Sequence, residues 1–352
     1  MAYTTINKSG DYFNTVLYTG TEPSNKAVTG VGFKPDFTWI KQRSGTEGHY
    51  LADIIRGSTY VIRSNESAVE NNRGSNGIQS FDSDGFTAGG GDDINSSGGT
   101  FTSWNWLAGG SQGSSNTDGS INTTYTSVNT TAGLSISKFT GTGSVATVGH
   151  GLGVAPNWII VKNLQRTENW RGYHSSLGNE YNINLSLSNA KENSSDMWND
   201  TSPTSSVFTV GTNNGVNYNG ENHIAYCFAE KSGYSKFGSY TGNGSTDGTF
   251  VYTGFKPAFV LIKRVNSAAH WVLRDNKRDS YNYTYKTLKP DANNAEAGDS
   301  NYNRVDFLSN GFKLRGGSSG TGTDTNGSEP YIYMSFAEAP LVGSNNVPCT
   351  AR

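Results

Sequence analysis

One ten-residue stretch occurs three times in this 352-residue chain, and it limits the possible folds more than any other feature. Its copies cover residues 32–41, 153–162 and 254–263, and each keeps a glycine, a proline, an aromatic residue and a closing lysine at the same spacing. Glycine and proline are typical of turns. The five or six apolar and β-branched residues that follow are too few for a helix and suit a buried strand. We therefore expect a turn and then a strand, with the lysine at the solvated end of that strand. The positions that mark the repeat are Gly32, Pro35, Lys41, Gly153, Pro156, Lys162, Gly254, Pro257 and Lys263.

Other landmarks recur at the same two intervals. Tyr18, Phe139 and Tyr240 each lie in a strand-like opening that ends in Thr-Gly, and they are 121 and 101 residues apart, as are the three glycines. Each copy also closes with a run in which every second residue is large and apolar, which is typical of a strand with one face on a core. The closing pairs are Trp104 and Trp106, Tyr226 and Phe228, and Met334 and Phe336. The agreement of the intervals indicates three copies of one β-unit.

The predicted fold is all-β, with three tandem antiparallel β-sandwich repeats of the jelly-roll or concanavalin-like type. Short strand-like runs with frequent turn signals fill each unit, and the closest approach to a helix, residues 185–197, is rich in Ser and Asn. The expected parts are a first repeat at 1–109, a linker at 110–130, a second repeat at 131–231, a third at 232–340 and a C-terminal tail at 341–352. The linker is rich in Gly, Ser, Asn and Thr, and we expect part of it to form a strand.

The composition argues against several classes of protein. A net charge of -2 without a basic block does not favour binding to nucleic acid through phosphates. An aromatic content of 12% argues against disorder. Two cysteines do not make a disulfide framework, and the chain has no apolar run long enough to cross a membrane. The N-terminus lacks the features of a signal peptide, so we expect a protein that is made in a cytoplasm and kept there or released by lysis.

The sequence contains no motif of a known catalytic or metal centre. The five histidines lack zinc-site spacing, and Asp92-Asp93 lacks the EF-hand pattern, so a solvated turn is favoured over a calcium site, which stays open. Glu230 and Glu338 close the second and third repeats at equivalent places, in separate domains, so they are poor partners for a glycosidase mechanism. We therefore expect no enzyme, no cofactor and no catalytic residue.

An aspartate and an arginine three residues apart occur at the same offset in two repeats. These are Asp53 with Arg56 and Asp275 with Arg278, while His174 begins the corresponding segment of the second repeat. Such a pair can form a bidentate ion pair across a turn. We favour a structural role, in which the pair fixes a loop, over a ligand site that the second repeat has lost.

Alternating tyrosines form the candidate ligand-binding residues. Tyr281, Tyr283 and Tyr285 lie in a polar segment, and exposed tyrosine among Asn, Ser and Thr is typical of surfaces that bind sugars or proteins. The alternative is that these tyrosines cover the outer face of a strand.

At the level of whole repeats, the sequence resembles a repeat family of marine bacteriophage virion proteins. The resemblance covers roughly residues 12–340 and is carried by four motifs together: the Tyr-Thr-Gly opening, Gly-Phe-Lys-Pro-x-Phe-x-x-Ile-Lys, the Asp-Gly-Phe turn, and the Trp-Asn-Trp or Cys-Phe-Ala-Glu closing strand. Members are commonly labelled tail-fibre or structural proteins, and some have lectin-like sandwich folds. The resemblance implies a virion protein that is made in the host cytoplasm, and it carries no catalytic residues to transfer.

Our expectation is a bacteriophage structural protein displayed on the virion, as a tail-fibre or appendage subunit that mediates host attachment. Its expected partners are other virion proteins, further copies of this chain, and a host-surface glycan or protein bound through several shallow sites. A first alternative is an architectural capsid decoration or tail subunit with no host ligand. A second alternative, a carbohydrate-active enzyme, lacks the required pair of acids. Head or tail location, oligomeric state and receptor stay open.

Overall fold

The computed structural model describes residues 4–298, 303–316, 324–343 and 348–350. It confirms the all-β prediction. Within these ranges, the α-helices have four residues each: α1 (Asp92–Asn95), α2 (Ser195–Trp198) and α3 (Asn214–Asn217). None of the described helices is long and apolar enough to cross a membrane. Two short 3-10 turns, η1 (Ser9–Asp11) and η2 (Gly74–Asn76), complete the helical elements of the described ranges.

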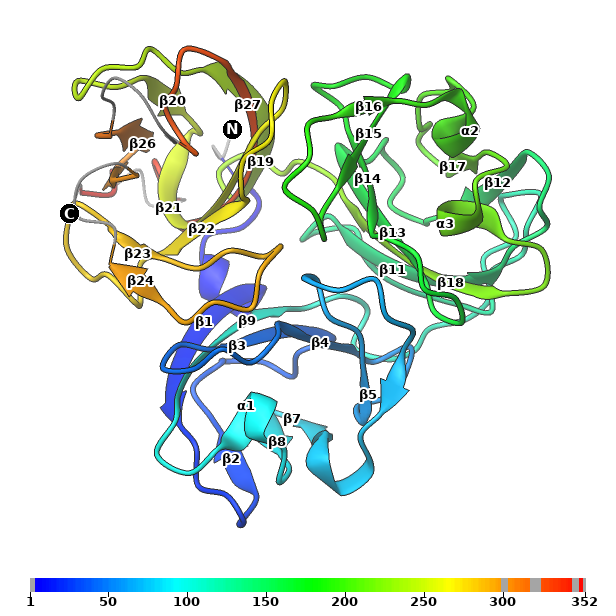
Figure 1. Cartoon of the computed structure of the whole chain (residues 1–352), viewed down its shortest axis with the longest axis horizontal. Helices are drawn as coiled ribbons and strands as arrows, with labels where there is room; N and C mark the ends of the chain where they lie inside the picture. Colours follow the sequence, from blue (N-terminus) through cyan, green and yellow to red (C-terminus); the bar gives the residue numbers. More distant parts are fainter. Residues whose placement is uncertain (1–3, 299–302, 317–323, 344–347, 351–352) are drawn as a thin grey trace.

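Three antiparallel sheets with the same strand order form the frame of the molecule, and Figure 1 shows them as three lobes around a common centre. We call them the first, second and third units. In the first unit the order is β1 (Phe13–Thr19), β9 (Thr100–Trp106), β3 (Phe37–Gln42) and β4 (Tyr50–Asp53). In the second it is β11 (Leu134–Thr140), β18 (Asn222–Phe228), β13 (Trp158–Asn163) and β14 (Arg171–His174). In the third it is β19 (Ser235–Thr241), β27 (Pro330–Pro340), β21 (Phe255–Arg264) and β22 (Val272–Asp275).

The second sheet is longer than the other two. It continues past β11 through β10 (Tyr125–Asn129), and past β14 through β15 (Tyr181–Asn184) and β16 (Glu192–Asn193). Strand β10 lies inside the segment that we expected to be a partly ordered linker, so this part of the linker belongs to the sheet.

Smaller strand groups lie outside the main sheets. They are β2 (Lys26–Val28), β8 (Gly85–Ala88) and β7 (Ile78–Asp82) in the first unit, β12 (Ala146–Gly149) and β17 (Val207–Val210) in the second, and β20 (Phe250–Tyr252), β26 (Gly311–Leu314) and β25 (Val305–Leu308) in the third. Two-stranded pairs are formed by β5 (Tyr60–Val61) with β6 (Asn71–Asn72), and by β23 (Lys286–Thr287) with β24 (Ala297–Gly298).

Each main sheet buries both of its faces. One face contributes to a single core shared by all three units, which contains the six large residues of the predicted closing strands. Rings from neighbouring units meet there: Phe13 with Phe336, Phe37 with Tyr226, and Trp158 with Trp271. The opposite face packs against the smaller sheet of its own unit and forms a separate core in each lobe. Because side chains alternate along a strand, the main strands contribute to the shared core with one face and to the core of their own unit with the other.

Backbone hydrogen bonds close the three units into a ring. Three donor–acceptor pairs connect first to second, second to third and third to first: Glu70 N to Leu164 O (2.9 Å), Lys191 N to Val265 O (2.8 Å) and Glu296 N to Arg43 O (2.8 Å). The acceptors are 121 and 101 residues apart, the same intervals as in the sequence repeat. The units are therefore joined in a closed ring and not in a linear series.

The glycines of the repeated stretch have the backbone conformation that the sequence indicated. Gly32, Gly153 and Gly254 have φ values of +89°, +73° and +83°, a region that favours glycine. The prolines differ from the prediction in one copy. Pro35 and Pro156 precede strands β3 and β13, whereas Pro257 lies inside β21, at a place where the pairing with β27 changes register. A bulge accommodates a residue that has no backbone N–H for the ladder.

The closing lysines are not solvated, and this expectation was wrong. Lys41, Lys162 and Lys263 are fully buried, and each Nζ donates to backbone carbonyls. Two of these bonds cross between units: Lys162 Nζ to Ser67 O (3.2 Å) and Lys263 Nζ to Ser188 O (2.9 Å). Burial lowers the pKa of each lysine to about 8. The ammonium groups therefore satisfy loop carbonyls in the interior, including those at junctions between units.

Candidate functional site

The two Asp–Arg pairs lie inside the molecule and join neighbouring units. Both pairs are fully buried, with Arg56 Nε 2.6 Å from Asp53 Oδ2 and Arg278 Nε 2.5 Å from Asp275 Oδ2. The other oxygen of each aspartate accepts two backbone N–H groups of the following turn. Both oxygens of each buried carboxylate accept hydrogen bonds from the protein itself. These contacts agree with the structural role that we favoured from the sequence.

Each aspartate also accepts a bond from the next unit in the ring. Tyr226 Oη donates to Asp53 Oδ2 (2.6 Å), and Trp104 Nε1 donates to Asp275 Oδ2 (3.1 Å). His174, at the corresponding position of the second unit, is buried with Nε2 3.4 Å from the Tyr333 carbonyl of the third unit. The second unit therefore has a histidine where the other two units have an ion pair, and this histidine also contacts a neighbouring unit.

Three of the acidic residues considered from the sequence, Asp93, Glu230 and Glu338, pair with cations. Asp93 is buried in α1 and pairs with Arg63 (2.8 Å) and Arg73 (3.3 Å), so the prediction of a solvated turn was wrong for this residue. Glu230 pairs with Lys236, and Glu338 pairs with Lys256. In the part of the chain that the structure describes, no group of three or more His, Cys, Asp or Glu side chains is placed to hold a metal ion.

The three candidate tyrosines come together on the surface of the third unit. Their exposed fractions are 81% for Tyr281, 40% for Tyr283 and 37% for Tyr285. The rings of Tyr283 and Tyr285 meet edge to face, with centroids 6.3 Å apart. Together with neighbouring polar residues they line an open hollow of about 420 Å³, whose lining residues are Arg278, Asp279, Ser280, Tyr281, Asn282, Tyr283, Tyr285 and Lys286. The tyrosines lie in a loop between β22 and β23, so the alternative of an outer strand face was wrong.

The loop that carries these tyrosines is longer than its counterparts. Its two sides are joined by the backbone pair Leu273–Leu288, which corresponds to Leu51–Ile62 in the first unit and Gly172–Ile183 in the second. The paired residues are 15 positions apart in the third unit and 11 in the other two. Four additional residues therefore extend this loop, which we call the tyrosine loop (residues 276–285), beyond what the repeated frame requires.

Several contacts anchor the tyrosine loop. Asp279 Oδ2 accepts from the backbone N–H groups of Tyr285 and Lys286, both at 2.8 Å. The Asn282 side chain exchanges two hydrogen bonds with the backbone of Phe307, one as donor (2.8 Å) and one as acceptor (2.9 Å). The Arg304 guanidinium lies over the Tyr283 ring, 4.1 Å from its centroid, at cation–π distance. The loop thus presents its aromatic rings from a fixed backbone, which lowers the entropy lost on binding.

Sequence reasoning found the tyrosines but missed their anchors. A comparison of copy lengths would have revealed the four added residues, because the intervals between landmarks are visible in the sequence. No sequence signal connects Arg304 with Tyr283, since they come from separate segments.

The fold and the site define the class of this protein: it is an all-β protein with an anchored aromatic loop on its surface. The chain belongs to the family described as a domain of unknown function (DUF7483), whose model matches residues 8–340. No curated protein matches the chain, and no solved structure matches it.

Proposed function

We propose that this protein is a structural component of a bacteriophage virion, displayed on the particle surface, and that its tyrosine loop binds a host-surface glycan. The proposal includes the interpretation of the three units as copies of one β-sandwich, modified for binding in the third copy. The observation that carries it is the insertion of exposed tyrosines into one copy of a frame that the other copies complete without them.

The chemistry of the hollow suits a sugar. Tyrosine combines a large apolar face with a polar hydroxyl, which matches a pyranose ring that has C–H bonds on its faces and hydroxyls at its rim. The hollow also contains charged and amide side chains of the same loop, and its volume of about 420 Å³ lies in the range of small-ligand sites. Its open shape favours one or two residues of a longer chain over a buried small molecule.

A virion setting is supported by the sequence resemblance and agrees with the ring of units. The shared core and the cyclic hydrogen bonds give a rigid body that can present a loop at a fixed orientation. A single shallow site binds weakly, so adhesion would depend on many copies on one particle, where avidity multiplies the affinity. A tail fibre or tail appendage provides such copies.

An architectural role without a host ligand is the second candidate, and a specific surface favours it. Strand β20 forms one edge of the outer sheet β20–β26–β25 and exposes Phe250 (44%) and Tyr252 (51%). Exposed aromatic residues on a sheet edge are suited to pairing with a neighbouring protein. In this alternative β20 contacts another head or tail protein, and the tyrosine loop has no ligand.

The decisive experiment measures binding of the purified protein to host cells and to host envelope polysaccharide. We expect binding that falls at least about tenfold in Tyr281→Ala and Tyr283→Ala, since loss of an aromatic contact costs on the order of 1–2 kcal/mol. Tyr125→Ala is the matched control, because Tyr125 is an exposed tyrosine of the second unit, far from the loop in sequence. If the parent protein binds neither cells nor polysaccharide, the proposal of adhesion is rejected. Loss of incorporation into particles by Phe250→Ser would then favour the architectural role, and release of reducing sugar ends would indicate an enzyme.

A further inference from the structure

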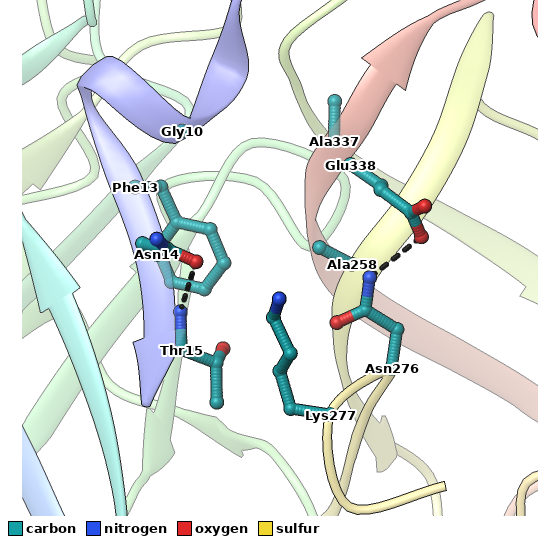
Figure 2. A pocket seen from close by; sticks show the side chains of 9 residues that line it. All are labelled: Gly10, Phe13, Asn14, Thr15, Ala258, Asn276, Lys277, Ala337 and Glu338. Carbon is teal, nitrogen blue, oxygen red and sulfur yellow. Dashed lines mark hydrogen bonds between the residues drawn. The ribbon is translucent and has the colours of Figure 1, made fainter. Parts of the chain in front are cut away.

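A second hollow, with a different chemistry, lies at the junction between the first and third units. Figure 2 shows it between β1 on one side and β21 and β27 on the other, with Lys277 reaching into the gap. We call it the junction cleft. Its volume is about 190 Å³, and it is lined by Gly10, Phe13, Asn14, Thr15, Ala258, Asn276, Lys277, Ala337 and Glu338.

The equivalent positions at the junction of the first and second units are apolar. Asn276 and Lys277 follow Asp275 as Ile54 and Ile55 follow Asp53, and both isoleucines pack in or against the shared core. The first unit therefore closes this position with apolar side chains, whereas the second unit has the small hydroxyl residues Ser175 and Ser176 here. The third unit instead places an amide and an ammonium at this site, where they contribute nothing to a hydrophobic core. Polar residues that the frame does not need are candidates for ligand binding.

Two polar groups of the cleft have no partner among the described residues. The Lys277 side chain is exposed, and its ammonium has no hydrogen-bond or ion-pair partner among the described residues. Thr15 is 3% exposed, and its hydroxyl has no hydrogen-bond partner within the described ranges. A buried hydroxyl without a partner costs free energy unless something binds it. These two groups face the same small space from opposite units.

The remaining wall fixes the charge and the size of a ligand. Glu338 is held by Asn276 Nδ2 (2.6 Å) and Lys256 Nζ (3.1 Å), so its charge is balanced and Lys277 leaves the cleft with one net positive charge. Phe13 and two alanines supply an apolar surface. The volume is below that of sites for drug-sized ligands, which limits the occupant to about one sugar residue.

We propose that the junction cleft binds a small monoanion, a carboxylate on a hydroxylated carbon skeleton such as a single uronic acid residue. The carboxylate pairs with Lys277, hydroxyl groups bond to Thr15 and Glu338, and the apolar face of the ring lies against Phe13. This site is separate from the tyrosine hollow, because the two hollows have no lining residue in common. The proposal therefore stands or falls independently of glycan binding by the tyrosines.

The test is calorimetric titration of the whole protein with D-glucuronate, with D-glucose as the uncharged probe and acetate as the charge without the skeleton. We expect glucuronate to bind with a dissociation constant of about 1 mM at low salt, and at least about tenfold more tightly than either comparison compound. A further titration uses oligogalacturonate. Tighter binding than that of glucuronate would assign the site to the end of a polysaccharide chain, and weaker binding would assign it to a free sugar acid.

Variants separate the cleft from other surfaces. Lys277→Met is expected to weaken glucuronate binding at least about tenfold, because a charge-assisted hydrogen bond is lost, and Asn276→Ile with Lys277→Ile, which copies the first unit, should abolish it. Tyr281→Ala, which alters the tyrosine hollow, should leave it unchanged. Unchanged melting temperatures show that the variants are folded. Absence of glucuronate binding by the parent protein up to about 20 mM, or equal binding by Lys277→Met, overturns the proposal.

Discussion

The Tyr226 hydroxyl of the second unit donates to the Asp53 carboxylate of the first unit, over 2.6 Å and in the shared core. The Asp53 carboxylate also accepts hydrogen bonds from the Arg56 side chain and from two backbone N–H groups. One buried carboxylate therefore fixes both a turn and the contact between two units. The third unit repeats the arrangement toward the first with Trp104 as the donor. A charge that is buried in this way is stable only while its partners stay in place.

Removal of this hydroxyl should destabilise the whole ring. Tyr226→Phe keeps the ring packing and removes one bond to a buried carboxylate, for an expected loss of about 1–3 kcal/mol in the free energy of unfolding. Urea denaturation followed by tryptophan fluorescence measures it, with Tyr125→Phe at an exposed tyrosine as the control. Equal midpoints for the two variants would show that the bond between units carries no stability.

The buried lysines reverse an expectation from the sequence, under which Lys263→Ala would have little effect. Lys263 Nζ donates to Ser188 O of the second unit and to Ala269 O of its own unit. Alanine leaves both carbonyls without this donor and opens a cavity, so we expect a loss of about 2–4 kcal/mol. The control is Lys8→Ala, whose lysine is 78% exposed. A denaturation midpoint of Lys263→Ala that coincides with that of Lys8→Ala would restore the solvated interpretation.

The repeat could be predicted from sequence because its signals are local. The intervals between glycines and the alternation of Trp104 and Trp106 depend on short segments, and both agree with the strands and with the shared core. The buried state of Lys263 could not be predicted in this way, because its acceptor Ser188 is 75 positions away and belongs to another unit. A lysine at the end of an apolar run is expected to be solvated unless the contact between the units is known.

The candidate site divides in the same manner. The exposed tyrosines were visible as aromatic residues in a polar segment, whereas the position of Arg304 over Tyr283 depends on the folded third unit. The junction cleft could not be predicted at all, since Thr15 and Lys277 are 262 positions apart in the sequence.

A glycine of the repeated stretch gives a prediction on backbone strain. Gly254 has φ +83°, a conformation that is costly for a β-branched residue. We expect Gly254→Val to lower the free energy of unfolding by about 1–3 kcal/mol. Gly10→Ala is the control, since Gly10 has no positive φ and open space around its Cα. Thermal melts that coincide for the parent and Gly254→Val would contradict a strained turn at this position.

Acid should destabilise the protein through its buried histidines. Burial lowers the pKa of His174 to about 4, against the opposing effect of its bond to the Tyr333 carbonyl, and burial likewise lowers the pKa of His223 to about 4. The unfolded chain binds protons from about pH 6.5 downward, so stability is lost as the pH falls from 6.5 to 4. For His174 the full loss is about 3 kcal/mol.

The matched variant for this effect is His174→Gln, which can still donate to the Tyr333 carbonyl but does not titrate. Urea unfolding at pH 7 and pH 4 should show a smaller difference in the variant than in the parent, by about 3 kcal/mol. An equal difference in both proteins would place the acid sensitivity elsewhere.

Shortening the tyrosine loop separates its function from the frame. Deletion of residues 280–283 restores the length found in the first and second units, whose paired positions are 11 apart. Because the Asp275–Arg278 pair and the Leu273–Leu288 pair lie outside the deleted segment, the fold should persist, with a loss of about 1–2 kcal/mol from the lost bonds between Asn282 and Phe307. Binding to host polysaccharide should disappear, while titration with glucuronate at the junction cleft should be unchanged. A shortened protein that melts normally and still binds polysaccharide would show that the added tyrosines are not the receptor contact.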